Sequence, residues 1–310
     1  YGSLLGYTEE EIKTNFHDYL LNASSTLQTS VEDVLNKLKQ NYNGFCFDEK
    51  AQHRVYCPWS VLNFFNRPDR GFQNYWYSSG GQPAVLMKYL VNHALARPIS
   101  YGEHKELRLS ELGSARQYEE IGLDVLLTQA GYYTIKEVTE DQYAVLGYPN
   151  EEVAVSMAQL YADELLNGKR LRIPGTSPLS TVMAQGTTDE VVEQFNNAVN
   201  AIDYQRYPIT DEASCKAYLQ VLLIGAAMIP RVEVHNALGR SDMEVEVGSR
   251  HWVFEFKYAQ KSSEVDRLLA IAVDQIKSRH YGENVNGKKL IQVALVFSEE
   301  ERRFKAWRTL

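Results

Sequence analysis

The sequence predicts an α/β protein of the α+β kind, in which mostly helical segments precede a C-terminal layered domain. After residue 208 the expected elements come in the order helix, three strands, helix, two strands, which is typical of a layered α/β domain. The chain has 310 residues, enough for two or three domains with their own cores. Its hydrophobic content of 44% and charged content of 23% are those of a soluble globular protein.

The first segment, residues 1–97, is predicted to be mostly helical. Thr8 and Glu11 have capping-box spacing, and Ser30 can cap a second helix whose apolar residues follow the helical period. The other elements expected here are short strands over 42–47 and 54–56 and helices over 58–65 and 83–95. The aromatic run FQNYWY at 72–77 favours core packing over nucleic-acid binding, although both interpretations remain open.

The second segment, residues 98–202, is predicted to combine helices with a β-hairpin. The expected elements are strands over 107–112, 132–137 and 143–147 and helices over 117–130 and 151–166. A winged-helix-like module is one interpretation, but no helix here is rich in base-reading residues. Residues 167–186 contain three Gly and two Pro and are predicted to form a loop, after which Thr187 and Glu190 start a helix.

The third segment, residues 203–310, is the expected layered domain. A helix over 211–229 is apolar nearly all round, so it is predicted to be buried between layers. Further elements are expected as a strand over 231–234, a helix starting at Ser263, and strands over 290–297 and 303–308. Between them lies the stretch from 233 to 257, which is predicted to fold as a β-hairpin.

The turn of this hairpin determines which side chains face each other. Gly248-Ser249 is a two-residue turn signal, because glycine tolerates the positive φ that such turns need. If Val247 pairs with Arg250, Asp242 lies opposite Glu255, with Cβ atoms roughly 4.5–5.5 Å apart. Two carboxylates in such positions repel each other unless a cation lies between them.

Strand alternation adds a lysine to this pair of acids. Lys257 is two residues beyond Glu255 and therefore shares its face, whereas Trp252, Phe254 and Phe256 face the other way and can pack a core. Facing carboxylates could hold Mg²⁺, and the ammonium group could stabilise developing charge on a phosphodiester. Glu212 is the expected third acid, unless it only complements the helix dipole. The alternative is a solvated face, because Glu244 and Glu246 also lie on it.

A family resemblance is carried by two strings, GRSD at 239–242 and WVFEFK at 252–257. They resemble the PD-(D/E)XK nuclease superfamily, with Asp242 as the first acid and Glu255 and Lys257 as the (D/E)-x-K. Glu212 lies where the family has its helix acid. The resemblance implies a restriction-endonuclease-like α/β/α fold and a Mg²⁺- or Mn²⁺-dependent endonuclease, with DNA as the expected substrate. A catalytically silent binding or regulatory protein of the same fold is the alternative.

One subgroup of the superfamily is similar over nearly the whole chain. Gln275-Ile276, in DQIKSRHY, looks like its QI-x-x-x-x-Y helix, and NYNGFCF, VYCPWSVLNFF, FQNYWYSSG, LLTQAGYYTIK and LGYPNEEV look like its earlier segments. In this bacterial subgroup the nuclease follows an AAA-ATPase-like domain. The phosphate-binding loop G-x-x-x-x-G-K-[ST] does not occur here. We therefore expect residues 1–97 to be only the lid-like end of such a domain, without ATP binding.

Four side chains are candidates for contacts with nucleic acid: Arg240, Gln275, Lys277 and Arg279. Contacts of such basic residues with phosphates bind without reading sequence, although a solvated surface would explain the same charges. Residues 205–310 contain 16 Lys and Arg against 14 Asp and Glu, whereas residues 1–204 contain 16 against 26. The C-terminal segment is therefore the better candidate for meeting a polyanion.

The remaining global features suit a cytoplasmic protein. The three cysteines are scattered and lack CxxC spacing, which is typical of a reducing compartment. The most apolar run, residues 219–229, is about half the length that a membrane span needs. The sequence does not determine the oligomeric state, the choice between DNA and RNA, or the cleavage specificity.

Overall fold

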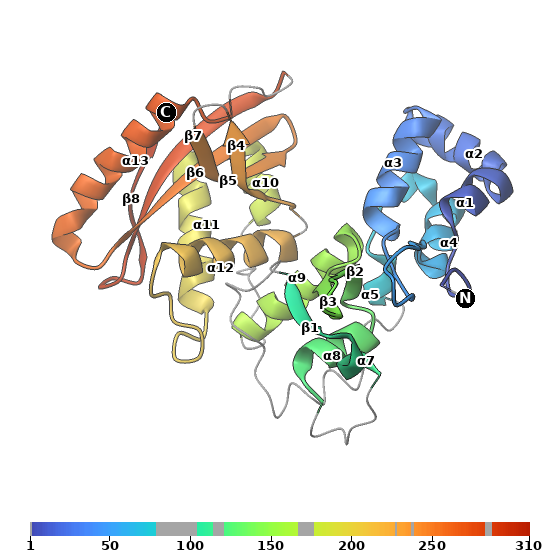
Figure 1. The fold of residues 1–310 in the computed structure, drawn as a ribbon. Coiled ribbons are helices and arrows are strands. Elements are labelled where there is room, and N and C mark those ends of the chain that lie inside the picture. The colour runs from blue at the N-terminus through green and yellow to red at the C-terminus, as the bar shows by residue number, and fades with distance from the viewer. Residues whose placement is uncertain are drawn as a thin grey trace. The chain divides into compact units, whose positions relative to one another are not determined.

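The fold divides into two compact units, which are described separately. The computed structural model describes residues 2–78, 104–113, 121–166, 177–226, 228–236, 239–282 and 287–310. Unit 1 comprises Tyr1–Ala94 and Gly102–Met157, and unit 2 comprises Leu95–Tyr101 and Ala158–Leu310. The boundary falls within helix α9 (Glu151–Leu165), which is coloured light green in Figure 1. The predicted division into segments 1–97, 98–202 and 203–310 stays a prediction.

Unit 1 begins with a cluster of helices, two of which have the N-terminal caps that the sequence predicts. Thr8 and Glu11 form the expected capping box of α1, and the Ser30 hydroxyl caps α3. The helices of this cluster are α1 (Glu9–Asn15), α2 (His17–Leu27), α3 (Val31–Tyr42), α4 (Pro58–Asn66), η1 (Pro68–Arg70) and α5 (Tyr75–Ser78). Their apolar faces share one core, in which Tyr42 and Phe64 are completely buried. The aromatic run also packs here, since Phe72 stacks on Phe64 with ring centroids 4.4 Å apart.

A small antiparallel sheet in the order β1-β3-β2 completes unit 1. Its elements are β1 (Lys105–Arg108), α7 (Leu109–Leu112), α8 (Leu123–Gln129), β2 (Thr134–Val138) and β3 (Tyr143–Gly147). The strand expected over 107–112 is wrong beyond Arg108. There the chain turns into α7, because the Leu109 N–H bonds the Gln142 carbonyl where β3 begins. The helix expected over 83–95 and the start of that expected over 117–130 lie outside the described residues.

The strands expected over 42–47 and 54–56 are reduced to isolated bridges. Phe45 pairs with Val55 and Tyr56 pairs with Tyr7, while Tyr42 belongs to helix α3. Gly44 explains why pairing stops early. Its φ is +102°, and a Cβ at this position would lie 2.1 Å from the Pro149 carbonyl oxygen, so only glycine fits.

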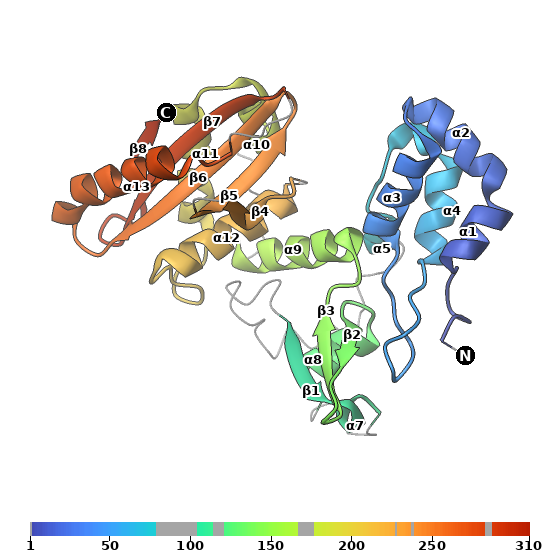
Figure 2. The same cartoon turned by 45° about the horizontal axis from the view of Figure 1, so that its top comes forward.

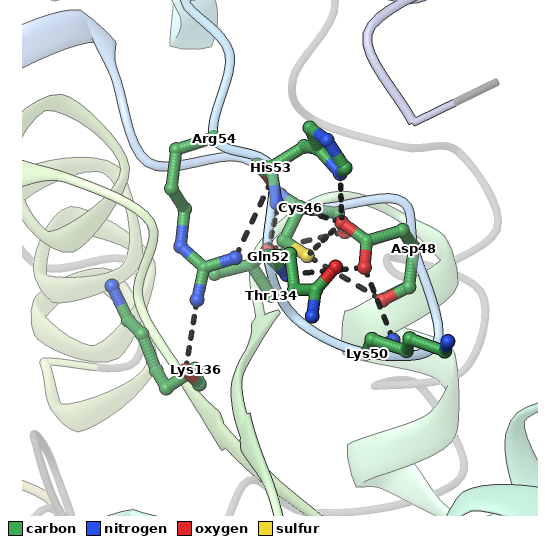
Figure 3. Close-up of polar contacts among 8 residues, drawn as sticks. All are labelled: Cys46, Asp48, Lys50, Gln52, His53, Arg54, Thr134 and Lys136. Atoms are coloured by element: carbon green, nitrogen blue, oxygen red, sulfur yellow. Dashed lines mark hydrogen bonds and ion pairs between the residues drawn. The ribbon is translucent and has the colours of Figure 1, made fainter.

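The loop between the two bridged segments is organised by one carboxylate, that of Asp48 (Figure 3). It accepts hydrogen bonds from the backbone N–H groups of Lys50, Gln52 and His53, at 3.0, 3.0 and 2.8 Å. Although partial burial opposes ionisation, these donors hold the pKa of Asp48 well below its usual range. The loop is tied to β2 where the Cys46 N–H donates to the Thr134 hydroxyl. Since backbone donors surround the carboxylate, this cluster of Cys, Asp and His serves the loop conformation.

A buried acid connects the start of α9 with the helical cluster. Glu152 is 3% exposed and accepts hydrogen bonds from the Ser60 hydroxyl at 2.7 Å and the Trp76 N–H at 2.8 Å. Burial raises the pKa of Glu152 to about 7, although these two donors oppose the shift. Folding therefore favours the neutral form of Glu152 relative to the unfolded chain.

Because of this shift, we expect the stability of unit 1 to depend on pH through Glu152. A raised pKa in the folded state means that the folded chain binds the proton more tightly. The free energy of unfolding should therefore fall as pH rises from 4.5 through about 7, by up to about 3 kcal/mol. Glu152→Gln should flatten this dependence in urea unfolding followed by circular dichroism. Exposed Glu137→Gln is the matched control, and parallel curves for Glu152→Gln and the wild type would contradict the assignment.

Unit 2 contains a five-stranded sheet in the order β4-β5-β6-β7-β8. The strands are β4 (Arg231–Asn236), β5 (Gly239–Val247), β6 (Arg250–Ala259), β7 (Lys289–Ser298) and β8 (Arg303–Thr309). All neighbours are antiparallel except β6 and β7, which are parallel and are connected through η4 (Ser262–Glu264) and α13 (Val265–Arg279). The predicted hairpin turn is confirmed, because Val247 pairs with Arg250 and Gly248 has a φ of +58°.

Helices cover both faces of this sheet, with α13 on one side and α11 (Thr188–Ala201) on the other (Figures 1 and 2). On the α13 side, Val253 packs with Ile276 and Tyr281. On the opposite side, Phe254 contacts Phe195 of α11, with ring centroids 5.6 Å apart. Trp252, Phe254 and Phe256 of β6 therefore share one buried face, as strand alternation predicts.

The loop expected over 167–186 is wrong at its end, where residues 179–185 form helix α10 (Leu179–Gln185). Tertiary contacts stabilise this short helix. The Trp252 indole N–H donates to the Met183 carbonyl at 2.9 Å, and the Arg250 guanidinium donates to the Gln185 carbonyl at 2.9 Å. These donors satisfy carbonyl groups that the last helical turn leaves without intrahelical partners.

Candidate active site

Helix α12 (Glu212–Gly225) meets strands β5 and β6 at a cluster of charged side chains. Its N-cap is Asp211, whose carboxylate accepts from the Ser214 N–H, so the helix starts at Glu212. The middle of the helix is buried, as its apolar sequence predicts. Its N-terminal part instead places Glu212 beside Lys257 of β6 and Lys216 beside Asp242 of β5.

Asp242 lies where β5 and β6 stop pairing. The register continues to Met243 opposite Phe254 and would next pair Asp242 with Glu255. Instead, the Phe256 N–H donates to Oδ2 of Asp242 at 2.8 Å. The carboxylate thus replaces a backbone partner at the end of the ladder. The residue is buried, and both of its oxygens are hydrogen-bonded.

Glu255 is the most deeply buried acid of the cluster, at 3% exposure. Its Oε1 accepts from the Lys257 ammonium at 2.9 Å, whereas Oε2 is buried and has no hydrogen-bond partner among the described residues. Burial, followed by the negative charge of Asp242, raises the pKa of Glu255 to about 7, and Lys257 opposes this shift. The two acids are therefore close enough for their negative charges to repel each other.

Lys257 connects the acids of β6 and α12. Its ammonium donates to Glu255 at 2.9 Å and to the Phe256 carbonyl at 2.8 Å, and lies 3.7 Å from Oε2 of Glu212. Burial raises the pKa of Glu212, while Lys257 lowers it and Asp242 raises it again. The four residues predicted to form the site, Asp242, Glu255, Lys257 and Glu212, are thus within electrostatic reach of one another.

A fifth member of the cluster, Lys216, was missed by the sequence analysis. Its ammonium donates to Oδ1 of Asp242 at 2.9 Å. The available signal was its spacing, because residues four apart on a helix lie on the same face, so Lys216 accompanies Glu212. A lysine at this spacing is common on helix surfaces, however, and only the packing of α12 beside β5 brings it to Asp242.

The four residues predicted to bind nucleic acid differ in how exposed they are and in what they contact. Arg279 packs across Gly239 and donates a hydrogen bond to the Tyr281 hydroxyl at 3.0 Å. This bond raises the pKa of Arg279, and the negative charges of Glu255 and Asp242 raise it further, but more weakly. Arg240 and Lys277 are exposed.

Gln275, the remaining candidate, is half-buried, and its Oε1 accepts no hydrogen bond from any described residue. Tyr281, for which packing and nucleic-acid contact were both open, packs in the core.

The chemistry of these carboxylates fits a divalent cation. The buried Oε2 of Glu255 has no donor among the residues that the structure describes, and the charge of Asp242 opposes ionisation of Glu255. A cation between the two acids would relieve both effects. Within the described ranges, no group of three or more His, Cys, Asp and Glu side chains is arranged to hold a metal ion directly. The two lysine ammonium groups lie on the acids instead.

The charged cluster lies within a stretch that is similar to a known protein family. Residues 212–307 match the PD-(D/E)XK nuclease superfamily. Searches of curated proteins and of solved structures found no match. The PD-(D/E)XK match begins at Glu212 and includes the whole charged cluster. It confirms the predicted α+β class, with a nuclease-type fold in the C-terminal sheet domain. No helix in the described ranges is both long and apolar enough to cross a membrane.

Proposed function

We propose that this protein is a Mg²⁺- or Mn²⁺-dependent nuclease that hydrolyses phosphodiester bonds in DNA. One observation carries the proposal. Two buried carboxylates, Asp242 and Glu255, lie beside Lys257 at the end of the β5–β6 ladder, within the stretch that matches the PD-(D/E)XK superfamily. A buried pair of like charges costs stability, so it is more readily explained by chemistry than by packing.

In this proposal Asp242, Glu255 and Glu212 would hold the cation in place of the lysine ammonium groups that now lie on them. When bound, a divalent cation polarises a phosphoryl oxygen and lowers the pKa of a bound water. The side chain of Asp242 is oriented by the Phe256 N–H, and that of Glu255 by Lys257. Lys257 can turn its ammonium group towards the attacking water or towards the developing negative charge, because it already lies among the acids.

The proposed substrate contacts come from α13 and β5. Arg279 is electrostatically coupled to Glu255 and Asp242, so a phosphate bound by its guanidinium would lie beside the acids. Exposed Arg240 and Lys277 would add sequence-independent contacts. The buried Oε1 of Gln275, which lacks a partner among the described residues, would accept a hydrogen bond.

A second candidate is a nuclease-fold protein that binds nucleic acid without cleaving it. The observation that favours it is the ion pair of Lys216 with Asp242, which neutralises one proposed metal ligand.

Under either function, we propose that residues 1–97 are the lid-like end of an AAA-ATPase-like domain that binds no ATP in this chain. We also propose that the protein acts in the cytoplasm.

A plasmid-nicking assay tests the proposed nuclease. We expect the wild type to nick supercoiled DNA with Mg²⁺ or Mn²⁺ and to lose this activity when a chelator removes the metal. Lys257→Met should lower the rate by at least about a hundredfold, because it removes a cation from the reacting centre. The charge-matched control is Lys305→Met, on β8, where the exposed lysine pairs with Glu301. Full activity of Lys257→Met would sink the assignment, and metal binding without any cleavage would favour the second candidate.

A further inference from the structure

At the proposed metal site, negatively charged acids alternate with two positively charged lysines. Lys257 joins Glu255 to Glu212, and Lys216 holds Asp242. Glu212 and Lys216 also interact electrostatically within the first turns of α12. With all three acids ionised, the two lysines leave a net charge of −1, whereas the acids with Lys257 alone would carry −2. Lys216 therefore halves the negative charge available to a divalent cation.

We infer that Lys216 is a positioning residue that acts as a built-in counter-cation, holding Asp242 in the metal-free protein and weakening the binding of a divalent metal. The inference rests on the proposed function for the location of the metal. Its basis is the contact of the Lys216 ammonium with Oδ1 of Asp242, at 2.9 Å. A divalent cation on this carboxylate would lie within a few ångströms of the ammonium, where like charges repel strongly.

The two lysines of the site differ in how they are held. The Lys257 ammonium donates to Glu255 and to the Phe256 carbonyl, which both belong to its own strand. Lys216 reaches across from α12 on a flexible side chain that is 18% exposed, so its ammonium can move into solvent without a change in the backbone. After such a movement Asp242 keeps the Phe256 N–H as a donor. Metal binding can therefore displace Lys216 and leave the carboxylate in position.

Removal of Lys216 should affect metal affinity and stability in opposite ways. Without its charge, Asp242 and Glu255 repel each other with less compensation, so the metal-free protein should unfold at a lower temperature. The same change makes the site more negative and removes the competing cation, so the metal should bind more tightly. A purely structural ion pair would behave differently, because its loss would disorder the ligands and weaken metal binding.

The experiment is a calorimetric titration of Mn²⁺ into the full chain, together with thermal unfolding with and without Mn²⁺. We expect Lys216→Met to bind Mn²⁺ at least about tenfold more tightly than the wild type, as for the loss of one competing charged hydrogen bond. Its metal-free unfolding temperature should be lower, and saturating Mn²⁺ should raise it more than that of the wild type. Lys305→Met, which removes the same charge on β8, should match the wild type in both measurements.

Two further variants keep the test decisive. Lys216→Arg retains the charge and should keep an affinity near that of the wild type. Lys216→Gln can still donate a hydrogen bond to Asp242 and replaces Lys216→Met if that variant does not fold, with the same expected gain. Unchanged or weaker Mn²⁺ binding by the neutral variants would overturn the inference, even if the wild type cleaves DNA. A gain in affinity in a protein that cleaves no nucleic acid would support the inference and refute the proposed nuclease.

Discussion

Glu255→Gln is expected to abolish cleavage of plasmid DNA while making the metal-free protein more stable. The loss of activity should be on the order of a thousandfold, because an amide cannot replace an ionised metal ligand. The gain in stability follows from the position of Glu255. Its carboxylate is buried, lies near the like charge of Asp242, and has one oxygen without a hydrogen-bond donor among the described residues.

The size of the stability gain follows from the same geometry. Because burial and Asp242 raise the pKa of Glu255 to about 7, ionising this acid at pH 8 costs more free energy in the folded chain than in the unfolded chain. Replacing it with neutral glutamine should raise the free energy of unfolding at pH 8 by about 1–3 kcal/mol. The amide oxygen can still accept from Lys257, so the local geometry is retained.

Opposite signs of the two effects distinguish a catalytic acid from a structural one. Rates come from the plasmid assay, and stability comes from urea unfolding without added metal. Glu193→Gln, an exposed acid on α11, is the matched control and should change stability by less than about 0.5 kcal/mol and activity not at all. A Glu255→Gln variant that loses stability together with activity would show that the carboxylate mainly holds the fold.

Phe254→Ala is expected to have the largest effect on stability. Phe254 is 0% exposed, and its ring contacts those of Trp252, Phe256 and Phe195, at centroid distances of 5.9, 6.1 and 5.6 Å. Truncation leaves a cavity between the sheet and α11 that rigid aromatic neighbours cannot fill. We expect unit 2 to lose about 3–5 kcal/mol of its free energy of unfolding.

Urea unfolding followed by circular dichroism measures this loss, with Phe47→Ala as the control. Phe47 is 51% exposed, so its truncation should lower the free energy of unfolding by less than about 1 kcal/mol. Cleavage should also fall in Phe254→Ala, since the next residue on β6 is Glu255. A loss below about 1 kcal/mol in Phe254→Ala would mean that the aromatic face of β6 does not hold α11 in place.

Local pattern was sufficient for the hairpin and most of the proposed site. A two-residue turn fixes the register of both strands, and alternation then assigns every side chain to a face. Thus Val247 pairs with Arg250 as predicted. The ladder ends at Met243, one residue short of the expected pairing of Asp242 with Glu255, but the charges of these two acids still interact. The capping signals at Thr8, Ser30 and Thr187 were equally local and are confirmed.

Predictions failed where contacts distant in sequence outweigh local preference. Residues 179–185 lie in a stretch rich in Gly and Pro, yet they form α10 because Arg250 and Trp252 satisfy its carbonyl groups. In the strand expected over 42–47, α3 extends to Tyr42, the Pro149 carbonyl lies against Gly44, and pairing is reduced to the Phe45 bridge. Neither partner is near in sequence, so propensity alone could not include it.

The sequence by itself determined the fold class, the turn at Gly248, and which of the acids share the face of Lys257, since these depend on periodicity and neighbouring residues. Only the tertiary structure decided what balances the acids. The contact of Lys216 with Asp242 depends on how α12 packs beside β5, and the residue numbers of the two partners differ by 26. Burial of Glu255, which raises its pKa, likewise depends on packing around β6. Charge pairing and desolvation act through space, so they appear only once the chain is folded.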